Sequence, residues 1–225
     1  MTAVRSGRPI AETIGAPARP GPPLQVAAIA AGPLFLVSGL VQALTRDGFD
    51  FSRNALSQLA LGDLGWVQTV TFLLTGALLI VGAAGTGRTL RGAPGGRRAP
   101  RLIGVFGASF LLAAVFPADA GAGFPAGTPE TGAATLSGHG ALHLLSGAIG
   151  YIALVAAFLV LARTFAARDE RGWALATRTV AAAVVAGFAA SSVSVPAFTV
   201  GAGLGLVWLA VITARLTSAS PTGRL

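Results

Sequence analysis

The chain of 225 residues is 53% hydrophobic and 11% charged, with a formal net charge of +8 and no cysteine. A soluble domain carries about 25% charged residues, so this composition excludes an ordinary soluble protein and favours a chain surrounded by lipid. The lack of cysteine excludes disulfides and thiolate chemistry. All sixteen basic residues are arginines that lie between apolar runs, which argues against nucleic-acid binding.

Residues 1–23 are rich in arginine and proline and are expected to form a disordered cytoplasmic tail. Residues 24–216 are expected to form a six-helix transmembrane domain, and residues 217–225 a second cytoplasmic tail.

Six apolar segments are long enough, at 1.5 Å per residue, to cross about 30 Å of hydrocarbon. The spacing predicts spans at about 24–44, 66–87, 102–118, 139–162, 174–195 and 196–216. Pro196 suits the first turn of the sixth helix. The predicted fold is therefore an all-α, polytopic transmembrane bundle of six helices.

The arginines predict the orientation of this bundle. Fourteen of the sixteen fall in the two tails, in the segments after the second and fourth spans, or at the adjoining ends of the fifth and sixth spans, which six spans place on one side. Cytoplasmic loops carry such an excess, so both termini are expected in the cytoplasm and the protein in the plasma membrane. Anionic membrane lipid is then the expected partner of the cationic segments. Most carboxylates and both histidines fall on the exoplasmic side.

Residues 50–60, between the first two spans, have apolar residues at helical spacing, with Ser52 placed to cap a helix. This pattern predicts a short interfacial helix. In one interpretation Asp50, Arg53 and Ser57 line a catalytic site, and in the other Asp50 and Arg53 simply pair with each other.

His139 and His143 stand four residues apart, so on a helix their imidazoles share one face and are spaced to hold a metal ion. Asp119, after the third span, would complete a His₂–carboxylate zinc set. Such a zinc ion would activate water for a hydrolase acting on lipid or amide bonds, assisted by Ser57 or Asp50. The alternative is a hydrogen-bonded cluster in which Asp119 and the histidines tie the third helix to the fourth.

A proton-coupled transporter would use Asp119 and the histidines as a relay, but no internal repeat is visible and no carboxylate lies deep in a span. Whether the protein is an enzyme stays open on this reasoning. The first interpretation is an integral membrane protein whose exoplasmic Asp, His and Ser side chains bind a small molecule or lipid headgroup, or fix the bundle.

Several short motifs resemble a family of prokaryotic six-helix membrane proteins catalogued as domain of unknown function 998. They are Asn54-Ala55-Leu56-Ser57-Gln58-Leu59, Gly65-Trp66, Phe116-Pro117-Ala118-Asp119, and the pair His139 and His143. The resemblance covers about residues 24–216 and implies a six-span bundle with no particular activity.

A looser likeness is to the alkaline ceramidase and adiponectin-receptor superfamily, which would imply a zinc site built from Ser57, Asp119, His139 and His143. That superfamily uses three histidines and seven spans, whereas this chain has two histidines.

Overall fold

The computed structural model describes residues 23–130 and 136–218, and this part of the chain forms six long helices and no strand. They are α1 (Pro23–Thr45), α2 (Gly65–Thr89), α3 (Arg98–Val115), α4 (Gly138–Ala166), α5 (Arg171–Ala189) and α6 (Val195–Ser218). Each is long and apolar enough to cross a membrane, which confirms the predicted all-α bundle of six spans. The predicted tails lie outside the described residues, except for their inner ends, which belong to α1 and α6.

The fifth span ends at Ala189 instead of residue 195, and the third span differs from its predicted bounds at both ends. It begins at Arg98 instead of residue 102 and ends at Val115 instead of residue 118. Long arginine side chains can reach out to the headgroups, so the first turn of α3 tolerates Arg98 and Arg101. At the other end Phe116 adopts an extended backbone, with φ −111° and ψ 94°, and Pro117 follows it. The missing N–H of proline then prevents the helix from resuming.

The short helix between α1 and α2 is present but is a single 3₁₀ turn, η1 (Leu56–Ala60). The expectation that Ser52 caps it is wrong. Instead, the backbone N–H and hydroxyl of Ser52 donate to one carboxylate oxygen of Asp50, at 2.8 and 2.6 Å. Residues 50–54 therefore form a turn that precedes the helix. Aspartate commonly stabilises turns in this way, because its side chain bonds to the backbone two residues on.

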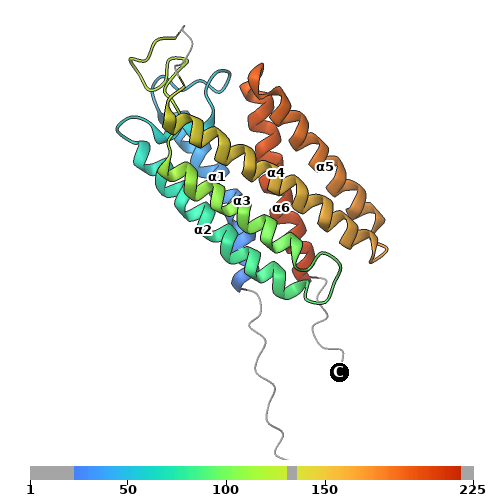
Figure 1. Ribbon diagram of the computed structural model, residues 1–225. Helices are drawn as coiled ribbons and strands as arrows, with labels where there is room; N and C mark the ends of the chain where they lie inside the picture. The colour runs from blue at the N-terminus through green and yellow to red at the C-terminus, as the bar shows by residue number, and fades with distance from the viewer. Residues whose placement is uncertain (1–22, 131–135, 219–225) are drawn as a thin grey trace, which may run out of the picture.

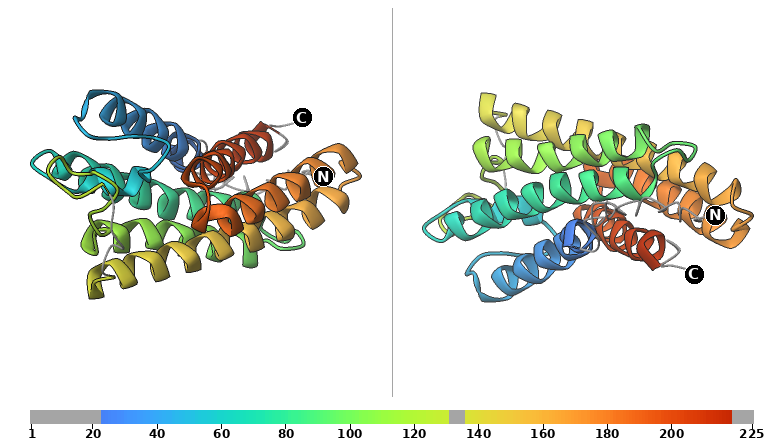
Figure 2. Two further views of the ribbon diagram at one scale, coloured as in Figure 1. Left: turned by 90° about the horizontal axis from the view of Figure 1, so that it is seen from above. Right: turned by 90° about the horizontal axis from the view of Figure 1, so that it is seen from below.

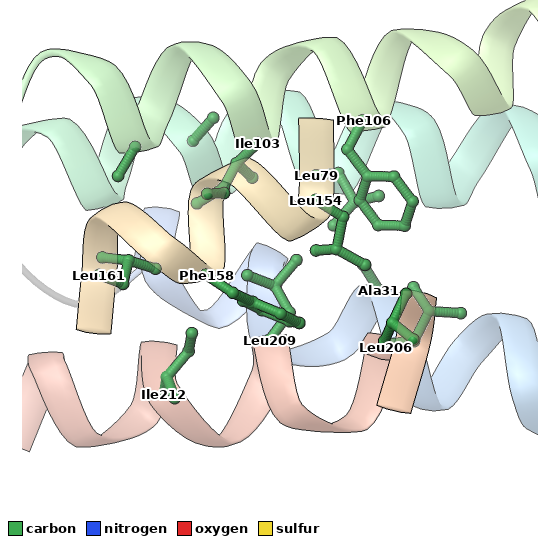
Figure 3. Close-up of a cluster of buried hydrophobic side chains, with 14 of the residues drawn as sticks. Ala31, Leu79, Ile103, Phe106, Leu154, Phe158, Leu161, Leu206, Leu209 and Ile212 are labelled. Carbon is green, nitrogen blue, oxygen red and sulfur yellow. The ribbon is translucent and has the colours of Figure 1, made fainter. Parts of the chain in front are cut away.

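The six helices form a closed ring, in which each helix packs against the next in the chain and α6 packs against α1 (Figures 1 and 2). At the α1–α6 crossing, a side chain on Gly32 would meet the carbonyl of Leu206. Apolar side chains from α1, α2, α3, α4 and α6 fill the middle of the ring (Figure 3). They include Ala31, Leu79, Ile103, Phe106, Leu154, Phe158, Leu161, Leu206, Leu209 and Ile212.

The two ends of the bundle differ in chemistry, and we name them by that difference (Figure 1). The histidine end carries residues 46–64, 116–130 and 136–143, and the arginine end carries residues 88–101 and 163–171 with the outer ends of α1 and α6. His143 and Arg163 stand twenty residues apart on α4, which is about 30 Å along a helix and about the thickness of the hydrocarbon. The exposed apolar residues of α4 between them are Leu144, Leu145, Ile149, Ile152 and Leu159. This belt faces lipid.

Glycines allow the helices to approach closely. A side chain on Gly82 of α2 would collide with Ala28 of α1, and one on Gly187 of α5 would collide with the backbone of α6. Close backbone approach at small residues is a main source of helix association in lipid, where the hydrophobic effect does not draw helices together. The ring therefore depends on these small residues at its crossings.

We predict that Gly82→Ala destabilises the bundle, because the new methyl group has no room against α1. Overpacking of this kind costs about 1–3 kcal/mol. Gly104→Ala is the matched control, since nothing lies within 4 Å of a methyl group placed there. Thermal unfolding in detergent is expected to show a lower Tm for Gly82→Ala and an equal or higher Tm for Gly104→Ala. Equal Tm values for the two variants would contradict the close α1–α2 contact.

Candidate functional site

The histidine end is covered by two connections, residues 46–64 and the described part of 116–137, which lie side by side above the helices (Figures 1 and 2). Arg46 stabilises the fold of the first connection by bonding to residues near its other end. Its guanidinium donates to the carbonyls of Leu59 and Leu61, at 2.8 and 2.5 Å. The same group lies 5.0 Å from the ring centre of Phe124, which belongs to the second connection. Arg46 is thus turned inward, and its charge interacts with carbonyl oxygens and an aromatic face.

Two amide side chains join the connections to each other. Asn54 is buried, and its Nδ2 donates to the carbonyls of Gly121 and Ala122, both at 3.3 Å. Gln58 donates from Nε2 to the backbone carbonyl of Asp119 at 3.2 Å, while its Oε1 accepts from the backbone N–H of Ala55. The Asn54–Leu59 motif is therefore the segment that fixes the backbone around Asp119.

The carboxylate of Asp119 caps the start of α4 through Ser137. Its Oδ2 accepts the backbone N–H of Ser137 at 3.0 Å, and its Oδ1 accepts the Ser137 hydroxyl at 2.5 Å. The Ser137 oxygen in turn accepts the N–H of Gly140 at 3.0 Å, which is the N-cap bond of α4. A side chain on Gly140 would collide with the Asp119 carboxylate, so this glycine makes the contact possible.

These bonds change the acidity of Asp119. The Ser137 hydroxyl, followed by the Ser137 backbone N–H, holds the pKa of the Asp119 carboxyl below its ordinary value of 3.8, because both donors favour the charged form. His143 and His139 lower this pKa further by their charge, to a smaller extent. Asp119 is therefore a carboxylate at physiological pH, and it makes no ion pair with an arginine among the described residues.

The two histidines have different surroundings. His143 is half-buried, and its Nδ1 lies 2.8 Å from the carbonyl of Phe116, at the end of α3. A carbonyl can only accept, so Nδ1 carries the proton, and in the neutral ring Nε2 is an acceptor. His139 is exposed, its ring centre lies 5.7 Å from that of Phe116, and its imidazole makes no hydrogen bond within residues 23–130 and 136–218.

Of the five residues predicted for the site, Asp119, His139 and His143 lie near the start of α4, where both histidines act on Asp119 through their charge. Asp50 belongs to a different group. It pairs with Arg53 at 3.0 Å, as the simpler interpretation of that segment predicts, and Arg53 also lies 3.6 Å from Glu130. Ser57 lies half-buried on η1 and makes no hydrogen bond within the described ranges. Neither Asp50 nor Ser57 bonds to Asp119 or to an imidazole in this structure.

Zinc would need at least three ligand side chains that converge on one point. In the described parts of the chain, no group of three His, Asp or Glu side chains is arranged to hold a metal ion. The described geometry therefore gives no support to the zinc set of His139, His143 and Asp119, which stays an untested prediction.

Sequence reasoning missed a polar stripe between α1 and α2, just below the histidine end. Gln42 donates from Nε2 to Gln68 Oε1 at 2.7 Å and to the Ser38 hydroxyl at 3.1 Å, and Ser38 lies 2.8 Å from the Thr71 hydroxyl. Polar residues four apart in an apolar run share one helix face, so the spacing of Ser38 and Gln42 could have indicated it. Side-chain hydrogen bonds of this kind hold helices together in lipid.

Six membrane-length helices with polar connections at both ends define a multi-pass integral membrane protein. The chain belongs to the family described as Protein of unknown function (DUF998), whose model matches residues 29–218. This match confirms the family expected from the motifs, all of which lie inside the matched range. No curated protein and no solved structure matches the chain.

We predict that Asp119→Asn destabilises the protein at neutral pH, because it weakens the cap on α4. The folded-state pKa of Asp119 is lowered, so the stabilising effect is complete above the ordinary value of 3.8 and is lost as the pH falls through the lower folded pKa. Thermal unfolding in detergent is expected to show a Tm difference between wild type and Asp119→Asn at pH 7 that shrinks on acidification.

The control for charge removal is Asp47→Asn, since Asp47 is exposed at the same end and makes no ion pair within the described residues. A second pair of variants leaves Asp119 unchanged and tests its contact with Gly140. Gly140→Ala is expected to lower Tm, and Gly138→Ala, which meets nothing within 4 Å, is expected to leave it nearly unchanged. If Asp119→Asn and Asp47→Asn have equal effects, the cap has no special role.

Proposed function

We propose that the histidine end faces the exoplasm and the arginine end faces the cytoplasm of the plasma membrane. Support comes from the distribution of charge. Arg88, Arg91, Arg97, Arg98 and Arg101 follow one another at the arginine end, and Arg163, Arg168 and Arg171 lie at the same end. The histidine end carries two arginines, Arg46 and Arg53, against five carboxylates. An excess of arginine in short loops marks the cytoplasmic side.

Labelling of intact cells tests this orientation, and the natural lack of cysteine simplifies it. Two single-cysteine proteins are made, each with the new cysteine at an exposed position. Gly92→Cys lies at the arginine end, and Ala126→Cys lies at the histidine end. A membrane-impermeant maleimide is expected to label the Ala126→Cys protein in intact cells, and the Gly92→Cys protein only after the cells are opened. The reverse pattern would refute the proposed orientation.

At the histidine end, we propose that the protein binds a small molecule or lipid headgroup that carries an ammonium group with N–H donors. The observation that carries this proposal is the state of Asp119. Its carboxylate is ionised, half-buried, held in place by Ser137 and without an arginine partner in the described chain. A fixed carboxylate of this kind attracts a cation that can donate hydrogen bonds.

The surrounding charges favour the same ligand. Arg53 is occupied by Asp50 and Glu130, and Arg46 is turned into the carbonyls of the first connection. Neither guanidinium therefore neutralises Asp119. The Nε2 of neutral His143 is an acceptor, because Nδ1 donates to Phe116, and the exposed His139 stands one turn before it on α4. Acceptors beside a carboxylate suit a donor such as a primary ammonium.

The other two functions that the sequence raised have less support. A zinc hydrolase needs a ligand set that the described residues do not assemble. A proton-coupled transporter needs titratable groups within the spans. The six helices contain no aspartate or glutamate, and their histidines lie in the first two turns of α4. The arrangement therefore favours binding at the surface over catalysis or transport.

The test compares two short-chain phospholipids that differ in donor capacity. In uncharged detergent, dioctanoyl phosphatidylethanolamine is expected to raise Tm more than dioctanoyl phosphatidylcholine, whose quaternary nitrogen has no N–H. A ligand that binds the folded state alone raises its stability as its concentration rises. Asp119→Asn is expected to weaken binding of the ethanolamine lipid about tenfold, since a charge-assisted hydrogen bond is lost. Asp47→Asn is the control and is expected to bind normally.

Two results would contradict this proposal. One is equal binding of the two lipids by the wild-type protein. The other is the detection, by elemental analysis, of one equivalent of bound zinc that is lost in His143→Ala. That result would favour the hydrolase over the binding function.

A further inference from the structure

The arginine end carries a second feature that the proposed function does not use, in the connection between α2 and α3. Two adjacent hollows lie there, of about 390 and 560 Å³. Arg97, Arg98 and Arg163 line the first, and Arg91 and Arg97 line the second. Ala93, Gly96 and Arg97 are common to both, so the hollows share an edge. We call them the arginine hollows.

The arginine hollows are held in shape by the fold. The Thr164 hydroxyl of α4 donates to the carbonyl of Pro94 at 2.8 Å, and Leu90 is completely buried beneath the connection. Gly92 and Gly95 have φ of 80° and 81°, the left-handed region in which glycine is favoured. A side chain on Gly95 would collide with Val160 of α4. The connection is therefore a compact turn fastened to α4, and its arginines start from fixed backbone positions.

The charge in the arginine hollows is uncompensated among the described residues. No carboxylate is among their lining residues. Of the two acids that the structure describes at this end, Glu170 is occupied by Arg215 at 2.8 Å, and the exposed Asp169 lies in the turn after α4. None of the four lining arginines makes an ion pair in the described parts of the chain. Four exposed guanidinium groups around one site attract an anion that can accept paired hydrogen bonds.

The depth of the arginine hollows in the membrane indicates which kind of molecule carries that anion. Arg163 lies about 30 Å along α4 from His143, so when His143 is at one headgroup layer Arg163 is at the other. Val160, one turn deeper on α4, also lines the first hollow and adds apolar surface on its hydrocarbon side. A phosphate with arginine around it and apolar surface below it matches a phospholipid at the bilayer surface.

We infer that the arginine hollows bind the phosphodiester headgroup of an anionic phospholipid, with Arg97 at the shared edge, Arg91 and Arg98 on its two sides and Arg163 from α4. Zwitterionic lipids carry the same phosphate but also a cationic amine, which the guanidinium groups repel. The site is therefore expected to select lipids by net charge.

Titration of the full chain in uncharged detergent tests this inference, with binding followed by native mass spectrometry. Dioctanoyl phosphatidylglycerol is expected to bind more tightly than dioctanoyl phosphatidylcholine, and inorganic phosphate is expected to bind far more weakly than either charged or neutral lipid. Arg97→Gln and Arg163→Gln are each expected to weaken phosphatidylglycerol binding about fivefold, and the double variant about twenty-five-fold. Arg97→Lys keeps the charge and loses the planar fork, so an intermediate loss is expected.

Arg171→Gln is the matched control, because Arg171 is exposed at the same end, at the start of α5, and lines neither hollow. It is expected to bind phosphatidylglycerol like the wild type.

The inference is overturned if Arg171→Gln weakens binding as much as Arg97→Gln, if the two lipids bind equally, or if inorganic phosphate binds as tightly as phosphatidylglycerol. Unchanged Tm values without lipid would show that the variants fold, as expected for exposed side chains. Asp119→Asn is expected to leave phosphatidylglycerol binding unchanged, so this test and that of the histidine end are independent.

Discussion

The contact of the Asp119 carboxylate with Ser137 and Gly140 determines how the histidine end of the molecule is arranged. Ser137 uses one hydroxyl both to donate to Asp119 and to accept the N–H of Gly140 in the first turn of α4. The helix dipole adds to this arrangement, since a carboxylate at a helix N-terminus is favourable. His143 lies about one turn further along α4. Its Nδ1 donates to the backbone carbonyl of Phe116, the residue that follows α3. Together these bonds fix where α4 enters the membrane relative to the end of α3.

The Asn54–Leu59 motif supports the same arrangement from a distant part of the chain. Asn54 and Gln58 come from a connection more than fifty residues earlier, yet both bond to the backbone of residues 119–122. A single connection could not satisfy its own carbonyls while leaving a carboxylate accessible. Here the side chains of the first connection supply the donors, and the backbone carbonyls of the second connection accept them.

Much of the fold could be predicted from the sequence because hydrocarbon leaves few alternatives. An apolar run of about twenty residues in lipid must be a helix, so the six spans followed from length alone. The position of Asp119 near the start of α4 was also predictable, since Phe116-Pro117 ends one helix close to the membrane surface and His139 begins the next. Ser137 and Gly140 were not identified, because the segment before α4 is rich in glycine, serine and threonine and nothing in it distinguishes the one hydroxyl that meets the carboxylate. The Gln42–Gln68 pair was missed for a related reason: each glutamine is an isolated polar residue until the two helices are placed side by side.

The contact between the first helix and the last constrains how the ring can be assembled. Gly32 of α1 packs against the backbone of Leu206, which is translated more than 170 residues later. Until α6 enters the bilayer, the face of α1 that receives it is covered by acyl chains or by whatever insertion machinery holds the nascent protein. Closure of the ring is therefore a late, long-range event in biogenesis, and a chain interrupted before α6 leaves a gap that any helix with small residues could occupy.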